Sequence, residues 1–271
     1  MGILVNGQTN GAVNPADRGL AYGDGVFRTC LLRAGRAVCW ARHYRKLQAD
    51  CDAIGLPCPP SHTLLAELTI AASGLPEAAG KIIVTRGEGP RGYAAPASPL
   101  PTRIVSAGPL PSYPAGHREQ GVNVRRCRLR LAIQPRLAGV KHLNRLENVI
   151  ARAEWADDTV AEGLLLDAEG HVIEGIATNI FAVRKGVLQT PDLSRCGVSG
   201  VTRERIIDAA VRDRVPLRVV DLSWDDLLGA DEVVLVNSLI GAWRVRSLAD
   251  RTWEGSEWTV RVRGWLDGAE D

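Results

Sequence analysis

The stretch Gly139–Asn148, which reads GVKHLNRLEN, holds one of only four lysines in a chain of 271 residues. Lysine and arginine together number 33, so nearly all of the positive charge is arginine. A guanidinium stays protonated at any working pH, whereas a lysine amine can lose its proton and form a Schiff base with an aldehyde. Lys141 is therefore a candidate covalent anchor, although a lysine taken alone is more often a solvated charge.

Two further candidate groups follow in the sequence. Glu174 begins the stretch EGIATNIF and is a carboxylate entering an apolar strand. The glycine-containing loop 197–200 leads into a helix expected over residues 201–211. The free N–H groups and the positive dipole end of such a helix can bind an anion. Read singly, the glutamate is more often exposed and the loop more often an ordinary helix start.

The composition is that of a folded protein with a large core. At 271 residues and 45% hydrophobic, the chain can form one large or two medium domains. The net charge of +2 implies no strongly acidic partner. The six cysteines show no Cys-x-x-Cys pair and no metal-like spacing with the five histidines, so we expect reduced thiols and no metal site. With no signal peptide or spanning apolar run in view, we expect a cytoplasmic protein without a membrane partner.

Hydrophobic periodicity predicts two α/β halves around a proline-rich middle. Seven prolines between Pro90 and Pro114 interrupt any long element. The predicted domains are therefore residues 1–115 and 120–271, the second carrying Lys141. The first has strands at 26–32 and 81–85 with helices at 41–54 and 61–72, and the second opens with a strand at 122–131.

Around the two candidate groups the patterns are more specific. Leu143, Leu146, Ile150 and Ala153 recur at helical spacing, which predicts an amphipathic helix with Lys141 just before its first turn. Antiparallel strands over residues 162–189 would place Glu174 inside a sheet.

Taken in order, these motifs resemble the fold-type IV pyridoxal-phosphate enzymes. That family includes branched-chain aminotransferases, D-amino acid transaminases and 4-amino-4-deoxychorismate lyases. The resemblance runs along nearly the whole chain. Its landmarks are Asp17–Phe27, Thr85–Tyr93, Gly139–Glu147, Glu174–Phe181, Thr190-Pro191, Gly197–Arg203 and Ala230–Asn237.

The resemblance implies a D-amino acid transaminase-like α/β (α+β) fold of two domains, with pyridoxal 5'-phosphate between them, in a homodimer. It implies that Lys141 forms the Schiff base and moves the substrate proton, and that Glu174 pairs with the pyridine nitrogen. A carboxylate held there stabilises the protonated, electron-accepting ring.

The cofactor phosphate is expected at the loop before residue 201. The resemblance assigns it to Val201 and Thr202, and to Ser238 by alignment with a family threonine. The family also supplies an arginine from a His-x-x-Arg-Leu motif, but this chain reads His43-Tyr44-Arg45-Lys46-Leu47. Lys46 offers a point charge rather than a bidentate fork, and Arg42 or Arg45 are alternatives for the same task.

The lysine stretch resembles the lyases more than the transaminases. The expected activity is a 4-amino-4-deoxychorismate lyase that makes 4-aminobenzoate and pyruvate for folate biosynthesis. An amino-acid transaminase on the same scaffold is the alternative. Thr29 is a lyase-like residue beside the cofactor, whereas Arg28 matches neither group. Arg91 and Tyr93 are the expected substrate-carboxylate ligands at the mouth of the site.

Two other functions are disfavoured. The glycines of Gly87–Gly92 have the spacing of a dinucleotide fingerprint, but the prolines that follow forbid the helix this fingerprint needs. The arginines of Val124–Arg136 alternate with apolar residues, which predicts a solvated strand face. Without an overall basic excess, we expect no nucleic-acid partner.

Overall fold

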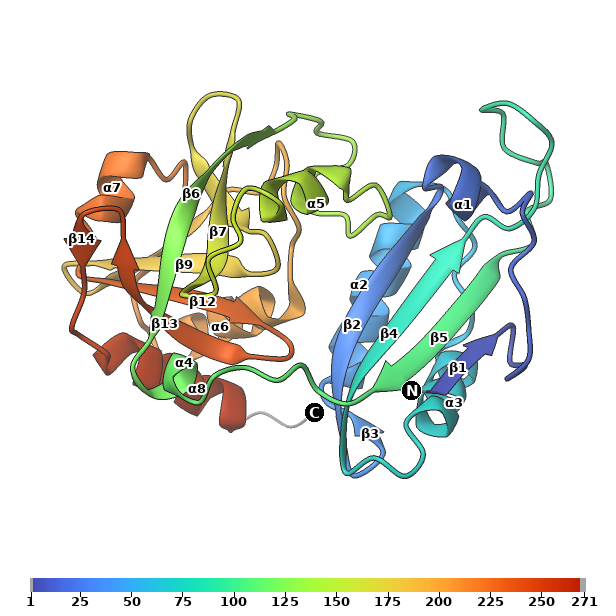
Figure 1. Cartoon of the computed structure of the whole chain (residues 1–271), viewed down its shortest axis with the longest axis horizontal. Coiled ribbons are helices and arrows are strands. Elements are labelled where there is room, and N and C mark those ends of the chain that lie inside the picture. Colours follow the sequence, from blue (N-terminus) through green and yellow to red (C-terminus); the bar gives the residue numbers. More distant parts are fainter. Residues whose placement is uncertain (1, 269–271) are drawn as a thin grey trace. The chain divides into compact units, whose positions relative to one another are not determined.

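The computed structural model describes residues 2–268, which fold into two compact units (Figure 1). The first unit comprises residues 2–112 together with Val140–Asn144, and the second comprises Tyr113–Gly139 together with residues 145–268. The sequence placed a boundary between residues 115 and 120, close to the observed start of the second unit. It also assigned Lys141 to the second domain, whereas the structure places the Lys141 segment in the first unit.

The first unit is built on a five-stranded antiparallel sheet. Its strand order is β1-β5-β4-β2-β3, with β2 and β4 paired over nine residues each. The strands are β1 (Gly2–Val5), β2 (Gly25–Arg33), β3 (Arg36–Ala37), β4 (Glu77–Thr85) and β5 (Thr102–Gly108). Side chains alternate across the sheet, so Val26, Arg28 and Cys30 lie on one face while Phe27 and Thr29 lie on the other.

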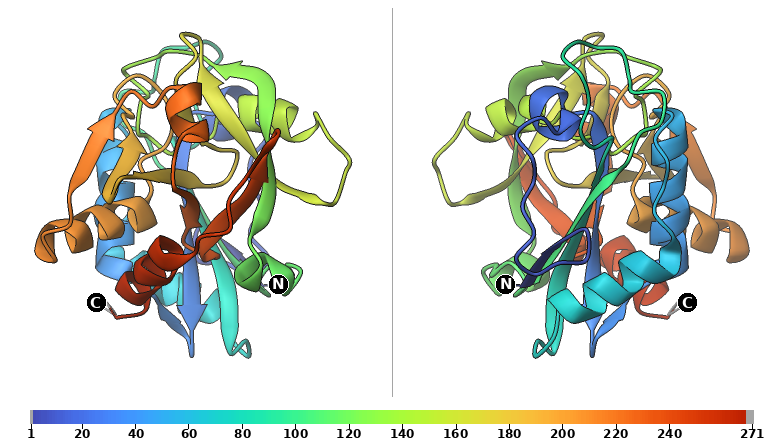
Figure 2. Two further views of the ribbon diagram at one scale, coloured as in Figure 1. Left: turned by 90° about the vertical axis from the view of Figure 1, so that its left-hand side faces the viewer. Right: turned by 90° about the vertical axis from the view of Figure 1, so that its right-hand side faces the viewer.

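Helices cover one face of this sheet. α2 (Trp40–Ala53) contacts β2 and α3 (Ser61–Ala71) contacts β1, β4 and β5, whereas the short helix α1 (Arg18–Tyr22) precedes β2 (Figure 2). Leu47, Leu64 and Leu68 are fully buried in the core beneath them. Gly80 on β4 lets the side chain of Leu32 pack closely against the backbone of β4, because a Cβ at residue 80 would lie only 2.5 Å from Leu32 Cδ1.

The Lys141 segment is extended and bonded to the start of β2. The Phe27 N–H donates to the Lys141 carbonyl at 2.9 Å, and the Leu143 N–H donates to the Gly25 carbonyl at 2.9 Å. The helix expected directly after Lys141 begins only at Leu146. These bonds pair backbone groups of the Lys141 segment with β2, so the segment does not form the first turn of the helix.

The second unit contains a nine-stranded mixed sheet. Its order is β11-β10-β9-β12-β13-β6-β7-β8, and β14 pairs with β13 off this path. The strands are β6 (Val122–Leu131), β7 (Val160–Asp167), β8 (Val172–Gly175), β9 (Asn179–Arg184), β10 (Val187–Pro191), β11 (Leu217–Val220), β12 (Glu232–Asn237), β13 (Gly241–Leu248) and β14 (Arg251–Thr252). Central strands such as β9 and β12 are buried on both faces, which explains their unbroken apolar sequences.

Five helices complete the second unit. They are α4 (Gly116–Glu119), α5 (Leu146–Arg152), α6 (Val201–Arg212), α7 (Trp224–Leu228) and α8 (Glu257–Asp267). α6 and α8 pack on each other, and their core includes Phe181, Ile206 and Trp265 (Figure 2). No helix within residues 2–268 is long and apolar enough to cross a membrane.

The prediction for α5 was wrong in its buried face. Leu146 and Ile150 are 68% and 51% exposed, whereas the small residue Ala151 is fully buried against β6 and β7. Helical spacing identified the helix, but this seven-residue helix is too short for spacing alone to show which side meets the sheet.

Candidate active site

Lys141 lies over the ring of Phe27. Its Nζ is 4.6 Å from the ring centroid, and the Nζ of Lys81 is 5.1 Å from the same centroid. Both contacts are within the range of cation–π attraction. Two of the four lysines in the chain therefore flank one aromatic ring in the first unit.

Thr29 shares this face of the sheet. It pairs in register with Lys81 of β4 and stands two residues after Phe27 on β2, so the three side chains point the same way. Phe27 and Thr29 are half-buried. The structure thus brings together Lys141 and Thr29, both expected from the sequence, and adds Lys81. The sequence motifs assigned no role to Lys81. The small number of lysines in the chain was the one sequence feature that could have drawn attention to it.

Arg91 and Tyr93 lie on the irregular segment between β4 and β5. Arg18 holds this segment, donating to the Gly92 carbonyl at 2.9 Å and to the Tyr93 carbonyl at 3.1 Å. The Tyr93 side chain is 89% exposed and its ring centroid lies 5.5 Å from that of Tyr22. The substrate-binding role of Arg91 and Tyr93 stays a prediction.

Lys46 lies on α2 and is half-buried, one helical turn before Asp50, with which it interacts electrostatically. Arg42 is also half-buried, while Arg45 is exposed. These three cations remain alternatives for a phosphate, and the difference in exposure disfavours Arg45.

In the second unit, Glu174 is buried on β8, only 3% exposed. Its Oε2 accepts the N–H of Val198 at 2.8 Å. The loop can approach this closely because residue 197 is glycine. A Cβ there would lie 2.7 Å from Ile173 Cγ2, and its φ of +85° also suits glycine.

Asn179, at the start of β9, clamps the same loop. Its Nδ2 donates to the Val198 carbonyl at 2.8 Å and its Oδ1 accepts the Gly200 N–H at 3.1 Å. Gly139 adds two backbone bonds, donating to the Gly197 carbonyl at 2.9 Å and accepting the Ser199 N–H at 3.0 Å. The sequence motif contained Asn179, but only the folded loop reveals its function.

A buried carboxylate on β7 supports the turn before Asn179. Glu162 accepts the N–H groups of Gly163 at 3.0 Å and Ala177 at 3.1 Å, and the hydroxyl of Thr178 at 3.2 Å. Burial raises the pKa of Glu162, although these hydrogen bonds oppose the increase. All of its recorded bonds go to the turn and its own strand, which assigns it a structural role.

The start of α6 is suited to bind an anion. Gly200 occupies the N-cap position and offers no side-chain cap, and the first backbone bond of the helix is Glu204 N–H to the Gly200 carbonyl at 3.1 Å. The N–H groups of Val201 and Thr202 find no recorded acceptor in the described part of the chain. The Thr202 hydroxyl lies 3.5 Å from that of Ser238, which follows β12. N–H groups and hydroxyls gathered at a helix N-terminus form a phosphate site.

These groups fit the expected cofactor. In the second unit, the structure joins the buried Glu174 to the loop that also forms the start of α6, where Val201, Thr202 and Ser238 gather. In the first unit, Lys141 presents its amine on an aromatic ring. A pyridine ring with an aldehyde and a phosphate requires such a carboxylate, amine and anion site.

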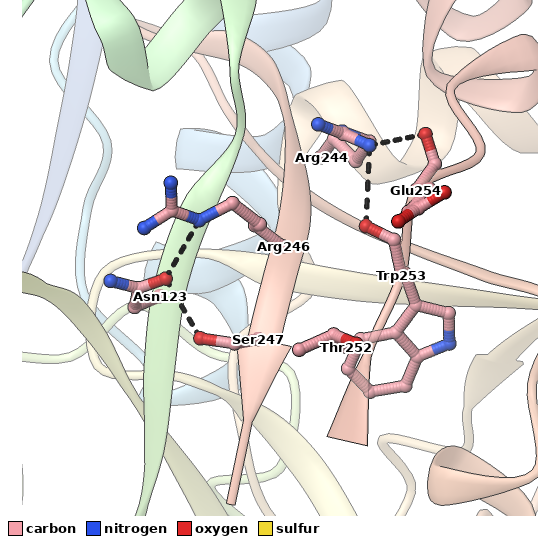
Figure 3. Close-up of a pocket in the computed structure, with 7 residues that line it drawn as sticks. All are labelled: Asn123, Arg244, Arg246, Ser247, Thr252, Trp253 and Glu254. Atoms are coloured by element: carbon pink, nitrogen blue, oxygen red, sulfur yellow. Dashed lines mark hydrogen bonds between the residues drawn. The ribbon is translucent and has the colours of Figure 1, made fainter. Parts of the chain in front are cut away.

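A cavity of about 610 Å³ lies elsewhere in the second unit, between β6, β13 and the segment after β14. Figure 3 shows that its polar groups bond to one another: Asn123 Oδ1 accepts from Arg246 Nε at 3.1 Å and from the Ser247 hydroxyl at 2.7 Å. Arg244 donates to the Trp253 carbonyl at 3.2 Å and also to that of Glu254. These bonds join neighbouring strands, and none of the expected site residues lines the cavity.

Asp167, Glu169 and His171 cluster in the turn between β7 and β8. Asp167 Oδ1 accepts the N–H groups of Glu169 at 3.0 Å and His171 at 2.8 Å, and Oδ2 lies 3.2 Å from His171 Nδ1. The turn itself explains this cluster.

The two α/β units and these groups define the class of fold-type IV enzymes. The chain belongs to the amino-transferase class IV family, whose sequence model matches residues 25–248. The fold class expected from the sequence is thereby confirmed.

Several known members of this family are similar along nearly their full length. An aminodeoxychorismate lyase of Vibrio harveyi is 35% identical over 90% of this chain and 90% of its own. The crystal structure of 4-amino-4-deoxychorismate lyase from Pseudomonas aeruginosa superimposes with a TM-score of 0.93, at 45% identity and 98% coverage of both chains. A D-alanine aminotransferase of Listeria monocytogenes is 28% identical over 89% of this chain and 85% of its own.

Proposed function

We propose that this chain is a pyridoxal-phosphate-dependent 4-amino-4-deoxychorismate lyase, which forms 4-aminobenzoate and pyruvate for folate biosynthesis. The observation that carries this proposal is the 45% identity to a lyase of nearly the same fold, over almost the whole of both chains. The Lys141–Phe27–Thr29 arrangement supports it, because it supplies an amine and a hydroxyl on one face of a sheet.

Each residue has a distinct task in this proposal. Lys141 holds the cofactor aldehyde covalently and, once released, its amine removes the proton from the amine-bearing ring carbon of the substrate. Glu174 keeps the pyridine nitrogen protonated. When bound, the cofactor supplies a ring that accepts the electrons left on the substrate carbon.

Anion binding and substrate handling complete the assignment. Val201, Thr202 and Ser238 hold the phosphate, assisted by Lys46. Thr29 offers its hydroxyl to the substrate beside Lys141. Arg91 and Tyr93 are the proposed ligands of a substrate carboxylate, and the cation of Lys81 is a further candidate because it shares the Phe27 ring with Lys141.

The atoms of the substrate are all accounted for in the two products. Loss of the ring-carbon proton and cleavage of the ring C–O bond leave an aromatic ring and the enolate of pyruvate. The enolate takes up one proton at its methylene carbon to become pyruvate, so the proton count also balances. No keto-acid acceptor is needed, and aromatisation makes the step irreversible.

An amino-acid transaminase is the second candidate, favoured by the 28% identity to a D-alanine aminotransferase. A paired assay separates the two. Purified enzyme is given aminodeoxychorismate while pyruvate release is followed, and in parallel D-alanine or a branched-chain amino acid with 2-oxoglutarate. Pyruvate from aminodeoxychorismate without an acceptor supports the lyase, whereas turnover only with 2-oxoglutarate would replace it by the transaminase.

We also propose a cytoplasmic homodimer, as the family resemblance implies. The exposed apolar residues of α5 support this, since Leu146, Val149 and Ile150 are 68%, 62% and 51% exposed and would be covered in an assembly. Sedimentation at micromolar concentration tests it, and a single monomeric species would contradict the dimer.

A further inference from the structure

A buried carboxylate on α2 lies beside the Lys141 segment. Asp50 is 2% exposed and contacts the guanidinium of Arg28, which is 3% exposed and comes from β2. Burial raises the pKa of Asp50, while Arg28, Lys46 and a hydrogen bond from the Lys141 N–H favour its ionised form. A buried carboxylate with these partners connects α2, β2 and the Lys141 segment.

The backbone of Lys141 is therefore held from two elements. Its carbonyl accepts the Phe27 N–H of β2 at 2.9 Å, and its N–H donates to the Asp50 carboxylate of α2. The position of a side-chain amine depends on the backbone that carries it, and a misplacement of about 1 Å can greatly reduce a rate. Both hydrogen bonds are made by backbone atoms of Lys141.

Two unusual residues of the sequence meet at this carboxylate. Arg28 lies on β2 directly after Phe27, and Lys46 lies on α2 one turn before Asp50. Both cations interact with Asp50. The Asp50 carboxylate offsets the charge of the buried Arg28, because a buried cation without an anion would be costly.

We propose that Asp50 is a positioning residue for Lys141, itself held by its contact with Arg28. This rests on the proposed function only in giving Lys141 its catalytic task. The hydrogen bond itself belongs to the protein without cofactor or substrate, so it can be tested separately.

Amide hydrogen exchange of the cofactor-free protein gives the direct test. The probe is the N–H of Lys141, followed by mass spectrometry in a peptide spanning residues 139–148. We expect Asp50→Ala to speed its exchange by at least about tenfold, since the acceptor is lost. Asp50→Asn keeps an oxygen acceptor and should show a smaller increase. Asp52→Asn, on the exposed side of the same helix, should exchange like wild type.

A second variant separates positioning from general stability. Arg28→Met combined with Asp50→Leu replaces the ion pair by apolar side chains, which commonly preserves stability. We expect this double variant to unfold near the wild-type urea midpoint and still show fast exchange at Lys141. In the cofactor-loaded double variant, kcat should fall at least about tenfold while KM stays within about twofold of wild type. This pattern is expected when the Lys141 amine is misplaced for the reaction but the substrate still binds.

Wild-type exchange at Lys141 in both Asp50→Ala and the double variant would overturn the positioning role and leave a purely structural ion pair. If exchange at Lys141 accelerates while the wild type itself shows no lyase activity, the proposed function fails and the positioning of Lys141 stands. Borohydride fixation of the cofactor to the peptide containing Lys141 then shows whether that lysine is the anchor.

Discussion

The two units hold their functional groups by different physical means. In the second unit, hydrogen bonds rather than ion pairs organise the loop before α6: Asn179 clamps it, Gly139 pairs with it, and the Glu174 carboxylate accepts one of its N–H groups. In the first unit, buried charges hold the reactive segments, as in the pair Arg28–Asp50. Groups that bind a cofactor need a fixed shape, whereas a reactive amine must also be held in a controlled electrostatic field.

A second charged group in the first unit makes the contrast clearer. Asp24 accepts from Arg18 Nε at 2.9 Å and from Arg86 Nε at 2.8 Å. Arg86 also donates to the carbonyls of Ile54 and Gly55, both at 2.7 Å, after the end of α2. Removing one charge from such a network leaves others unpaired, so the first unit should respond strongly to charge changes at these ion pairs.

The largest effect is expected at the amine of the first unit. Lys141→Ala should abolish turnover, because the proposed mechanism uses this one amine for both the covalent bond and the proton transfer. Pyruvate release measures turnover, and peptide mapping after borohydride treatment locates the cofactor. Lys185→Arg, on an exposed turn, is the control and should behave like wild type. Labelling at Lys46, Lys81 or Lys185 would show that the anchor is misassigned.

The next largest effect is expected at the carboxylate of the second unit. Glu174→Gln keeps an oxygen for the Val198 N–H but loses the negative charge, so the loop should stay in place while the chemistry slows. We expect a drop of tens-fold, about 2 kcal/mol of barrier, with cofactor still bound. Glu169→Gln, 57% exposed in the turn before β8, is the matched control. Activity within threefold of wild type would mean that the ring nitrogen is protonated by other means.

A smaller effect is expected on cofactor retention, where the two units can be compared directly. Lys46→Ala should raise the cofactor dissociation constant about tenfold, or about 1.4 kcal/mol. Lys46→Arg should tighten binding if the planar group is admitted. Cofactor fluorescence measures both constants. Should Lys46→Ala bind like wild type while Arg42→Ala or Arg45→Ala does not, an arginine holds the phosphate.

Asn179→Ala is the corresponding change in the second unit. It removes two hydrogen bonds from the loop while leaving every charge in place, so we expect a similar weakening of about 1 kcal/mol in cofactor binding. Titration at several salt concentrations distinguishes the two. The loss in Lys46→Ala should shrink as salt rises, whereas the loss in Asn179→Ala should be independent of salt. Equal salt dependence would contradict the contrast between the units.

The smallest effect concerns acid stability. Burial alone would raise the pKa of Asp24, but the hydrogen bonds from Arg86 and Arg18 outweigh it and hold the pKa below its usual value of 3.8. A lowered folded-state pKa stabilises the protein above the unfolded pKa, and this contribution is lost as pH falls below about 3.8. Asp24→Asn should therefore lower the free energy of unfolding at pH 7, with a smaller difference from wild type near pH 3. Urea unfolding at both pH values measures the difference in the free energy of unfolding between variant and wild type. A larger difference near pH 3 than at pH 7 would contradict the prediction.

Much of the site could be predicted because its residues occur in short ordered motifs. Lys141 and Glu174 were proposed from their neighbours in the sequence, and their roles stay predictions. The structure places the Thr202 hydroxyl 3.5 Å from that of Ser238, which is compatible with the predicted phosphate site. A helix after Lys141 was predicted correctly, but its predicted buried face was wrong. Its start was also misplaced, because pairing of the Lys141 segment with β2 delays the helix to Leu146.

Other residues were inaccessible to sequence reasoning because their function depends on distant partners. Asp50 is 91 residues from Lys141 in the sequence, and nothing in α2 indicates that its carboxylate meets that backbone. Lys81 meets the Phe27 ring only through the register of β2 with β4. Tertiary pairing of this kind has no local sequence signature.

A cofactor phosphate bound at the uncapped start of α6, as proposed, would make the cofactor a folding ligand as well as a reagent. Backbone donors at the helix start that the protein leaves unpaired would be satisfied by a bound phosphate, which the unfolded chain cannot hold. A ligand at a hundredfold excess over its dissociation constant stabilises the folded state by about 2.7 kcal/mol. We therefore expect resistance to proteolysis to rise with cofactor concentration, so that a cell short of cofactor would lose the protein itself and not merely its activity.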